Sequence, residues 1–60
     1  MDPDSNLAEQ LEIAQDILKD ADKGRAISED DAVRLAELVE GLDDWLRGRG
    51  FLPKRWSRGR

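Results

Sequence analysis

Residues 7–46, LAEQLEIAQDILKDADKGRAISEDDAVRLAELVEGLDDWL, contain two apolar patterns separated by a short polar turn. In both patterns apolar side chains recur in steps of three and four, which keeps them on one face of an α-helix. We call these faces the two leucine stripes. They consist of Leu7, Leu11, Ala14, Leu18 and Ala21, and of Ala32, Leu35, Val39, Leu42 and Leu46. Two amphipathic helices with a short connection predict an all-α fold, an antiparallel two-helix hairpin.

Helix start and stop signals set the expected boundaries. Pro3 suits the first turn of a helix, where its missing N–H is not needed. Gly24 suits the left-handed position after a helix end, and Ser28 suits the cap of a second helix. We expect residues 57–60 to be disordered. The predicted segments are a hairpin at 1–48, with helices at about 5–23 and about 29–48, and a basic aromatic tail at 49–60.

The apolar faces are wider than the roughly 100° that one helix–helix contact covers. Ile13 and Ile17 widen the first stripe, and Leu38 and Trp45 widen the second. A chain of 60 residues without cysteine has few other ways to gain burial, so the extra area calls for a further partner. Two partners could cover the extra apolar area: the folded-back tail, or a second hairpin that completes a four-helix bundle. We favour the homodimer.

Gly41 stands inside the second apolar pattern, where it costs about 1 kcal/mol relative to alanine. Its missing side chain would let another backbone or a ring approach closely. A tolerated surface glycine explains the residue equally well. The sequence leaves these two interpretations open.

The charge of the chain is divided sharply between its two parts. Residues 1–46 hold all 14 acids and four bases, a net charge of −10, whereas residues 47–60 hold six bases and no acid. No apolar run approaches the roughly 20 residues of a membrane span, and the acidic start of the chain does not resemble a signal peptide. We therefore expect a soluble, cytoplasmic protein with no membrane partner.

The residue types argue against catalysis. The chain has no histidine, cysteine or tyrosine, so no nucleophile–base pair can be assembled from the usual groups. The acids of the first helix lie away from its leucine stripe, where solvent keeps carboxylates from acting as tuned acids or bases. We expect no enzyme activity, no catalytic residue, no metal site and no cofactor.

One weak metal alternative is a calcium loop at residues 20–31, which is twelve residues long and lies between the two helices. Asp20 and Asp22 occupy its first and third ligand positions. Arg25 replaces the glycine that the sharp turn needs, and Asp31 replaces the bidentate glutamate. Helix stop and start signals explain the same residues, so calcium binding is a minor alternative.

The tail carries the strongest indication of a binding surface. Large apolar residues stand among bases, and Pro53 prevents a continuation of the helix. Aromatic residues and arginine dominate the energetics of protein interfaces. The predicted partner-binding residues are Trp45, Phe51, Leu52, Lys54, Arg55 and Trp56.

Nucleic-acid binding through the same tail is the alternative. Bases can track phosphates while aromatic rings stack on nucleotides, although the acidic body would repel the polymer. The residues involved would be Lys54, Arg55, Arg58 and Arg60, with Phe51 and Trp56.

Three segments carry a resemblance to known proteins: residues 27–38, residues 42–46, and Gly50-Phe51-Leu52-Pro53 followed by Trp56. They resemble small helical proteins encoded by bacteriophages of actinobacteria. The resemblance implies a bacterial host cytoplasm and brings no activity or site residue. Together with the residue patterns, it predicts a small non-catalytic module that binds or regulates a host protein.

Overall fold

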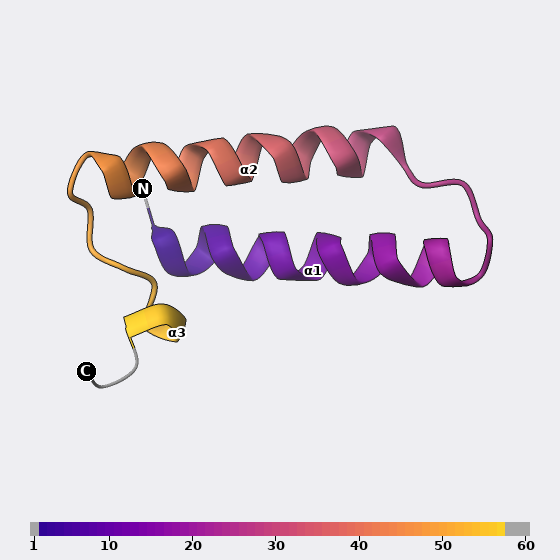
Figure 1. Ribbon diagram of the computed structural model, residues 1–60, viewed down its shortest axis with the longest axis horizontal. Helices are drawn as coiled ribbons and strands as arrows, with labels where there is room; N and C mark the ends of the chain where they lie inside the picture. The colour runs from indigo at the N-terminus through magenta and orange to yellow at the C-terminus, as the bar shows by residue number, and fades with distance from the viewer. Residues whose placement is uncertain (1, 58–60) are drawn as a thin grey trace.

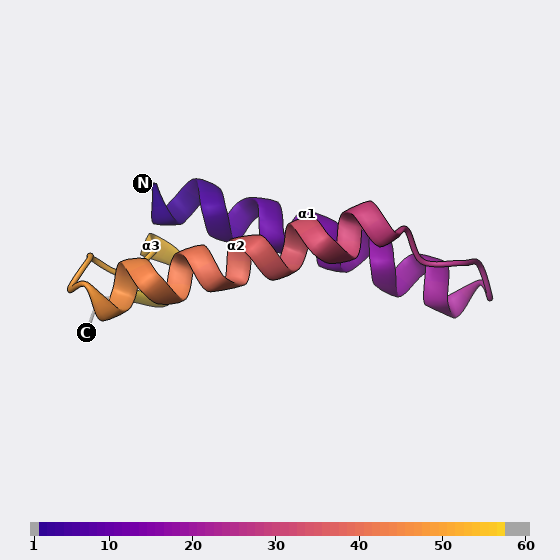
Figure 2. The same cartoon turned by 90° about the horizontal axis from the view of Figure 1, so that it is seen from above.

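The computed structural model describes residues 2–57 and confirms the all-α hairpin. Helix α1 (Pro3–Asp22) and helix α2 (Glu29–Arg47) run antiparallel, and a one-turn helix, α3 (Lys54–Ser57), lies beside the first half of α1 (Figure 1). Seen from above, the two long helices cross each other (Figure 2). Ser57 is helical rather than disordered, and the expectation for residues 58–60 lies outside the described residues.

Helix α1 begins at Pro3, two residues before the expected position, because Asp2 caps it. The Asp2 carboxylate accepts hydrogen bonds from the backbone N–H groups of Asp4 and Ser5 at 3.0 and 3.4 Å. It also accepts one from the Ser5 hydroxyl at 2.9 Å. These bonds, the hydroxyl bond first, lower the pKa of the Asp2 carboxyl below its usual range.

The turn between the long helices uses the predicted signals. Gly24 has a φ of 70°, the left-handed conformation that glycine adopts without steric cost. The N–H of Arg25 donates to the carbonyl of Asp20 at 2.8 Å, which closes the helix end in a Schellman motif. Helix α2 then begins after Ser28, whose hydroxyl accepts from the N–H of Asp31 at 3.3 Å.

The buried strip of the two helices overlaps the leucine stripes only in part, since Leu7 and Leu42 are buried stripe residues. Ile13 and Leu38, which lie outside the stripes, are buried. Leu18 and Val39 belong to the stripes but are 68% and 48% exposed. The buried apolar side chains are Leu7, Ile13, Leu38 and Leu42, together with Pro3 and Pro53. One hairpin therefore leaves a large part of both stripes uncovered.

Polar contacts on one flank of α1 accompany this offset between the buried strip and the leucine stripes. Asn6 and Glu9 precede Ile13 by seven and four residues, so all three share a face. The Asn6 amide donates to the Leu38 carbonyl at 3.0 Å. Glu9 accepts two bonds from the Arg34 guanidinium at 2.8 and 3.0 Å. The Arg34 hydrogen bond lowers the pKa of the Glu9 carboxyl, and the same bond raises the pKa of Arg34.

Candidate partner-binding surface

The tail leaves α2 through a second left-handed turn. Helix α2 ends at Arg47, and Arg49 adopts a φ of 69°, which is unusual for a residue other than glycine. The N–H of Gly50 donates to the carbonyl of Trp45 at 2.9 Å, which closes the helix end. This turn reverses the chain and sends it back toward the start of α1 (Figure 1).

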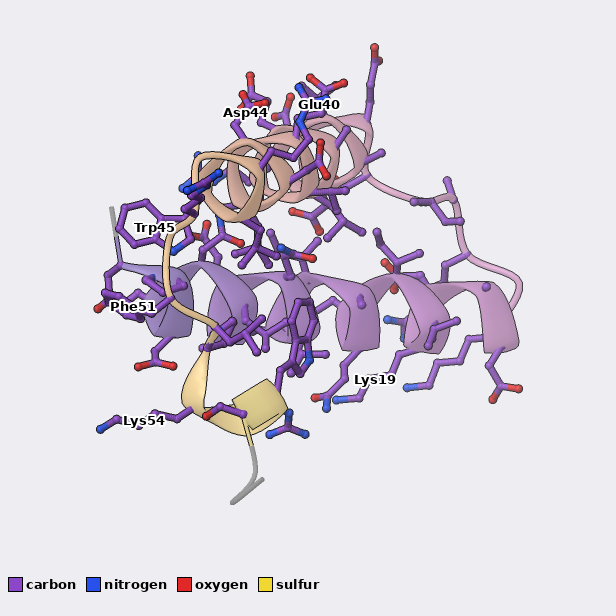
Figure 3. The ribbon with its side chains drawn as sticks, turned by 60° about the vertical axis from the view of Figure 1, so that its left-hand side comes forward. Lys19, Glu40, Asp44, Trp45, Phe51 and Lys54 are labelled. Atoms are coloured by element: carbon purple, nitrogen blue, oxygen red, sulfur yellow. The ribbon has the colours of Figure 1, made fainter. Side chains whose placement is uncertain are left out.

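Trp45 holds the first part of the returning segment. Its indole Nε1 donates to the carbonyl of Phe51 at 2.9 Å. The Trp45 and Phe51 rings form an edge-to-face pair with centroids 5.4 Å apart (Figure 3). A Cβ at Gly50 would lie 2.2 Å from Cε2 of the Trp45 ring, so only glycine fits beneath the indole. Trp45, predicted as a contact residue, is half-buried and positions Phe51.

Asp4 holds the second part of the segment. Its carboxylate accepts a hydrogen bond of 2.7 Å from the backbone N–H of Lys54, the first residue of α3. Pro53 and Pro3 are both fully buried at this end of the molecule. The tail is therefore attached to the start of α1 by an acid 50 residues away in the chain. An antiparallel hairpin places the start of the tail near Asp4, but sequence reasoning did not predict this hydrogen bond and missed Gly50 and Pro53 as anchors.

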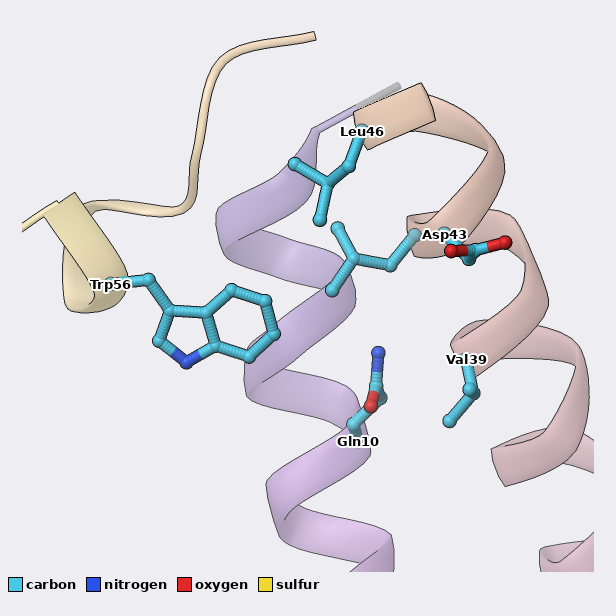
Figure 4. A pocket seen from close by; sticks show the side chains of 6 residues that line it. Gln10, Val39, Asp43, Leu46 and Trp56 are labelled. Carbon is cyan, nitrogen blue, oxygen red and sulfur yellow. The ribbon is translucent and has the colours of Figure 1, made fainter. Parts of the chain in front are cut away.

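Trp56 lies over a groove between the two long helices. The groove has a volume of about 210 Å³, and the Trp56 side chain reaches toward it from α3 (Figure 4). Its lining consists of Gln10, Val39, Leu42, Asp43, Leu46 and Trp56. Trp56 stays 48% exposed, so the tail covers one end of the hairpin and only in part.

Phe51 and Leu52 are presented to solvent between these anchors. They are 65% and 47% exposed, although the residues on either side, Gly50 and Pro53, are held in place. Lys54 and Arg55, the next residues, are also exposed. Of the predicted contact residues, Phe51, Leu52, Lys54, Arg55 and Trp56 are thus exposed, while half-buried Trp45 contacts Phe51 and Trp56 also lines the groove between the long helices.

The bases at the end of α2 and in the tail differ in whether their side chains form ion pairs. Arg47 pairs with Asp43 at 3.5 Å and with Asp44 at 3.7 Å. Among residues 2–57, the side chains of Lys54 and Arg55 form no ion pair. Two further bases proposed for nucleic-acid contact, Arg58 and Arg60, lie outside the described residues.

The calcium alternative gains no support from the arrangement of the turn. Asp20 lies 3.9 Å from the guanidinium of Arg25, and α1 ends at Asp22. In the described part of the chain, no group of three or more His, Cys, Asp or Glu side chains is placed to hold a metal ion. No polar or charged side chain is buried there either.

No helix within residues 2–57 is both long enough and apolar enough to cross a membrane. Comparison of the chain with protein-family models, with curated protein sequences and with solved structures found no match.

Proposed function

We propose that this chain is a small non-catalytic protein-binding module, homodimeric, that acts on a host protein in the cytoplasm of a bacterium infected by a phage. The tail surface makes the contact with that protein. The phage setting is supported by the resemblance of the segments at residues 27–38, 42–46 and 50–56. The contact residues are Trp45, Phe51, Leu52, Lys54, Arg55 and Trp56.

The observation that carries this proposal is the display of Phe51 and Leu52 on an anchored segment. Large apolar side chains in a loose tail would lose conformational entropy on binding, which reduces affinity. Here the Trp45 indole and the Asp4 carboxylate already hold the segment at both ends. Apolar burial contributes about 25 cal/mol per Å², so two such side chains can anchor an interface.

The charges next to these side chains indicate the chemistry of the partner. Lys54 and Arg55 extend from the same surface, and Figure 3 shows Lys54 directed away from the helices. A complementary partner would offer an apolar pocket for Phe51 and Leu52 with acidic groups at its edge. Such complementary charges steer encounter and fix the orientation of the bound partners.

Matched variants test the contact surface. Three proteins are immobilised separately: the unaltered chain, the double variant Phe51→Ser/Leu52→Ser and the single variant Val33→Ser. Each is exposed to an actinobacterial lysate, and the bound proteins are identified by mass spectrometry. Val33 is the control because it is 51% exposed but lies on α2, away from the tail. We expect one protein to bind the unaltered chain and Val33→Ser but not the double variant. Equal capture by all three would overturn the proposal.

The homodimer is supported by the uncovered parts of the leucine stripes. Leu18 and Val39 remain exposed after the hairpin has formed and the tail has docked. Light scattering over a hundredfold range of concentration tests this part of the proposal. We expect about twice the monomer mass of 6.8 kDa, and 6.8 kDa at every concentration would contradict it.

Nucleic-acid binding is a second candidate because Lys54 and Arg55 are exposed without ion pairs within the described residues. Trp56 is less suited to stacking on a base, since it already packs over the groove between the helices. A gel-shift assay at low and moderate salt decides, because phosphate contacts weaken steeply as salt is raised. No shift at low salt excludes this candidate.

A further inference from the structure

The docked tail is held at two separate places, one on each side of Leu52. On one side, the Phe51 carbonyl accepts the hydrogen bond of the Trp45 indole at 2.9 Å, and the two rings form their edge-to-face pair. On the other side, the backbone N–H of Lys54 donates to the Asp4 carboxylate at 2.7 Å. Within the described part of the chain, the N–H and carbonyl of Leu52 form no hydrogen bond. The tail can therefore turn at Leu52 without breaking a hydrogen bond of that residue.

Pro53 determines how the chain after this point moves. Its ring fixes its own φ at about −65° and keeps the preceding residue, Leu52, in extended backbone conformations. Pro53 is fully buried, whereas Leu52 is 47% exposed. Rotation at Leu52 therefore carries Pro53 and the helical turn after it together, as one piece.

Helix α3 depends on its contacts with α1 because it has only one turn. A helix of four residues is unstable in water by itself, since forming the first turn fixes several dihedral angles for very few hydrogen bonds. The first N–H groups of a helix have no partner inside it, and Pro53, the residue before α3, has no side-chain oxygen to accept from them. Asp4 of α1 supplies that oxygen. The turn is therefore stable only while it stays docked against α1.

The same turn places Trp56 over the groove between α1 and α2. The Trp56 N–H donates to the Pro53 carbonyl at 2.9 Å, so the position of the ring depends on the turn being formed. The indole lines the groove and stays 48% exposed (Figure 4). The bond between Lys54 and Asp4 and the contact of Trp56 with the groove belong to one helical turn, so loss of either weakens the other.

We propose that residues 53–57 form a latch that opens as one unit about Leu52. In the closed form Asp4 holds the helical turn and Trp56 lies over the groove. In the open form the bond to Asp4 is lost, α3 unfolds and Trp56 leaves the groove, while Trp45 keeps the start of the tail in place. The latch is a property of the chain itself and does not depend on the proposed partner.

The latch divides the predicted contact residues of the tail into two sets. Phe51 and Leu52 lie before it and are presented in both forms. The latch controls the other three, which are Lys54, Arg55 and Trp56. A partner that takes up the whole Trp56 indole binds only the open form, and the closed fraction lowers its apparent affinity. A partner that takes up only Phe51 and Leu52 is indifferent to the latch.

Amide hydrogen exchange measured by NMR tests the latch, because amides that open together respond together to one substitution. Asp4→Ala removes the acceptor of the Lys54 N–H. We expect exchange of the Lys54 and Trp56 amides to become faster by the same factor, about fivefold. The Gly50 amide, which is bonded to the end of α2, should keep its rate.

Asp16→Ala is the matched control, since it removes an exposed acid of the same helix and should change none of the three rates. A faster Lys54 amide beside an unchanged Trp56 amide would overturn the latch, because the turn would then persist without its bond to Asp4. An equally faster Gly50 amide would overturn the position of the hinge, since the whole tail would then open at the end of α2. Three unchanged rates in Asp4→Ala would also contradict the proposal.

Fluorine NMR follows the two parts of the tail directly, because the chain has two tryptophans, one on each side of Leu52. In the fluorotryptophan-labelled Asp4→Ala variant, we expect the Trp56 signal to move toward its position in denaturing urea and the Trp45 signal to keep its folded position. Asp4→Asn retains a side-chain oxygen as acceptor and should restore most of the Trp56 shift. Movement of both signals in Asp4→Ala, or of neither, would overturn the proposal.

Discussion

Gly50→Ala should undo the attachment of the tail to Trp45. A Cβ at this position would lie 2.2, 2.3 and 2.5 Å from three atoms of the Trp45 ring, against about 3.4 Å or more in an ordinary contact. The indole must therefore move by more than about 1 Å, which breaks its hydrogen bond to the Phe51 carbonyl and its edge-to-face contact with the Phe51 ring. Each of these contributes about 0.5–1.5 kcal/mol, so we expect a loss of about 1–3 kcal/mol.

Urea unfolding followed by circular dichroism and by tryptophan fluorescence measures this effect. Gly48→Ala is the matched control, since a Cβ there would meet its nearest neighbour, the Asp44 carbonyl oxygen, at 3.4 Å. We expect Gly48→Ala to change the unfolding free energy by a few tenths of a kcal/mol, in keeping with a surface substitution. Gly50→Ala with the stability and emission spectrum of the unaltered chain would refute the steric reasoning.

Three further substitutions test other parts of the molecule. Arg49→Gly should raise the unfolding free energy in urea by up to about 1 kcal/mol, because the residue at this position has a φ of 69°; a loss of stability would contradict this. Asp4→Ala should raise the hydrogen-exchange rate of the Lys54 amide about fivefold, since it removes the acceptor of a bond worth about 1 kcal/mol. The Glu9 pKa is lowered in the folded chain, so stability that is present above about pH 4.5 is lost as pH falls through the folded pKa. Glu9→Gln should flatten this acid dependence of the urea midpoint, and an unchanged slope would show that the pair with Arg34 does not contribute.

The sequence predicts the hairpin well because its signals are local. The three-and-four spacing, Gly24 and Ser28 each act within a few residues, and the structure uses all of them. The sequence does not predict which strip of each helix contacts the other helix. A wide apolar face allows several rotations, and the choice is made by long-range polar contacts such as that between Asn6 and the Leu38 carbonyl.

Gly41 illustrates the same limit. A Cβ there would lie 3.7 Å from the Asn6 amide nitrogen, an ordinary contact, so the approaching group is a side chain and not a backbone or ring. Glycine at position 41 is therefore compatible with the approach of the Asn6 side chain, but that approach does not require glycine.

The residue types of the tail are enough to propose it as a contact surface, but they do not predict how it is attached to the hairpin. The antiparallel hairpin brings the tail near Asp4, but no pattern in either segment indicates the hydrogen bond between the Asp4 carboxylate and the N–H of Lys54, 50 residues away. The fit of Gly50 beneath Trp45 depends on the left-handed turn at Arg49, where residue preferences would favour glycine. Such contacts follow from the path of the chain after α2 and not from the composition of the tail.

The docked tail presents Phe51 and Leu52 from fixed anchors. Nuclear Overhauser contacts between the Trp56 indole and the methyl groups of Leu42 and Leu46 test it most directly, because all three residues line the same groove. The structure predicts cross-peaks from the Trp56 ring to these methyl groups on α2. A Trp56 ring with contacts only to its sequence neighbours would show a detached tail and contradict the account.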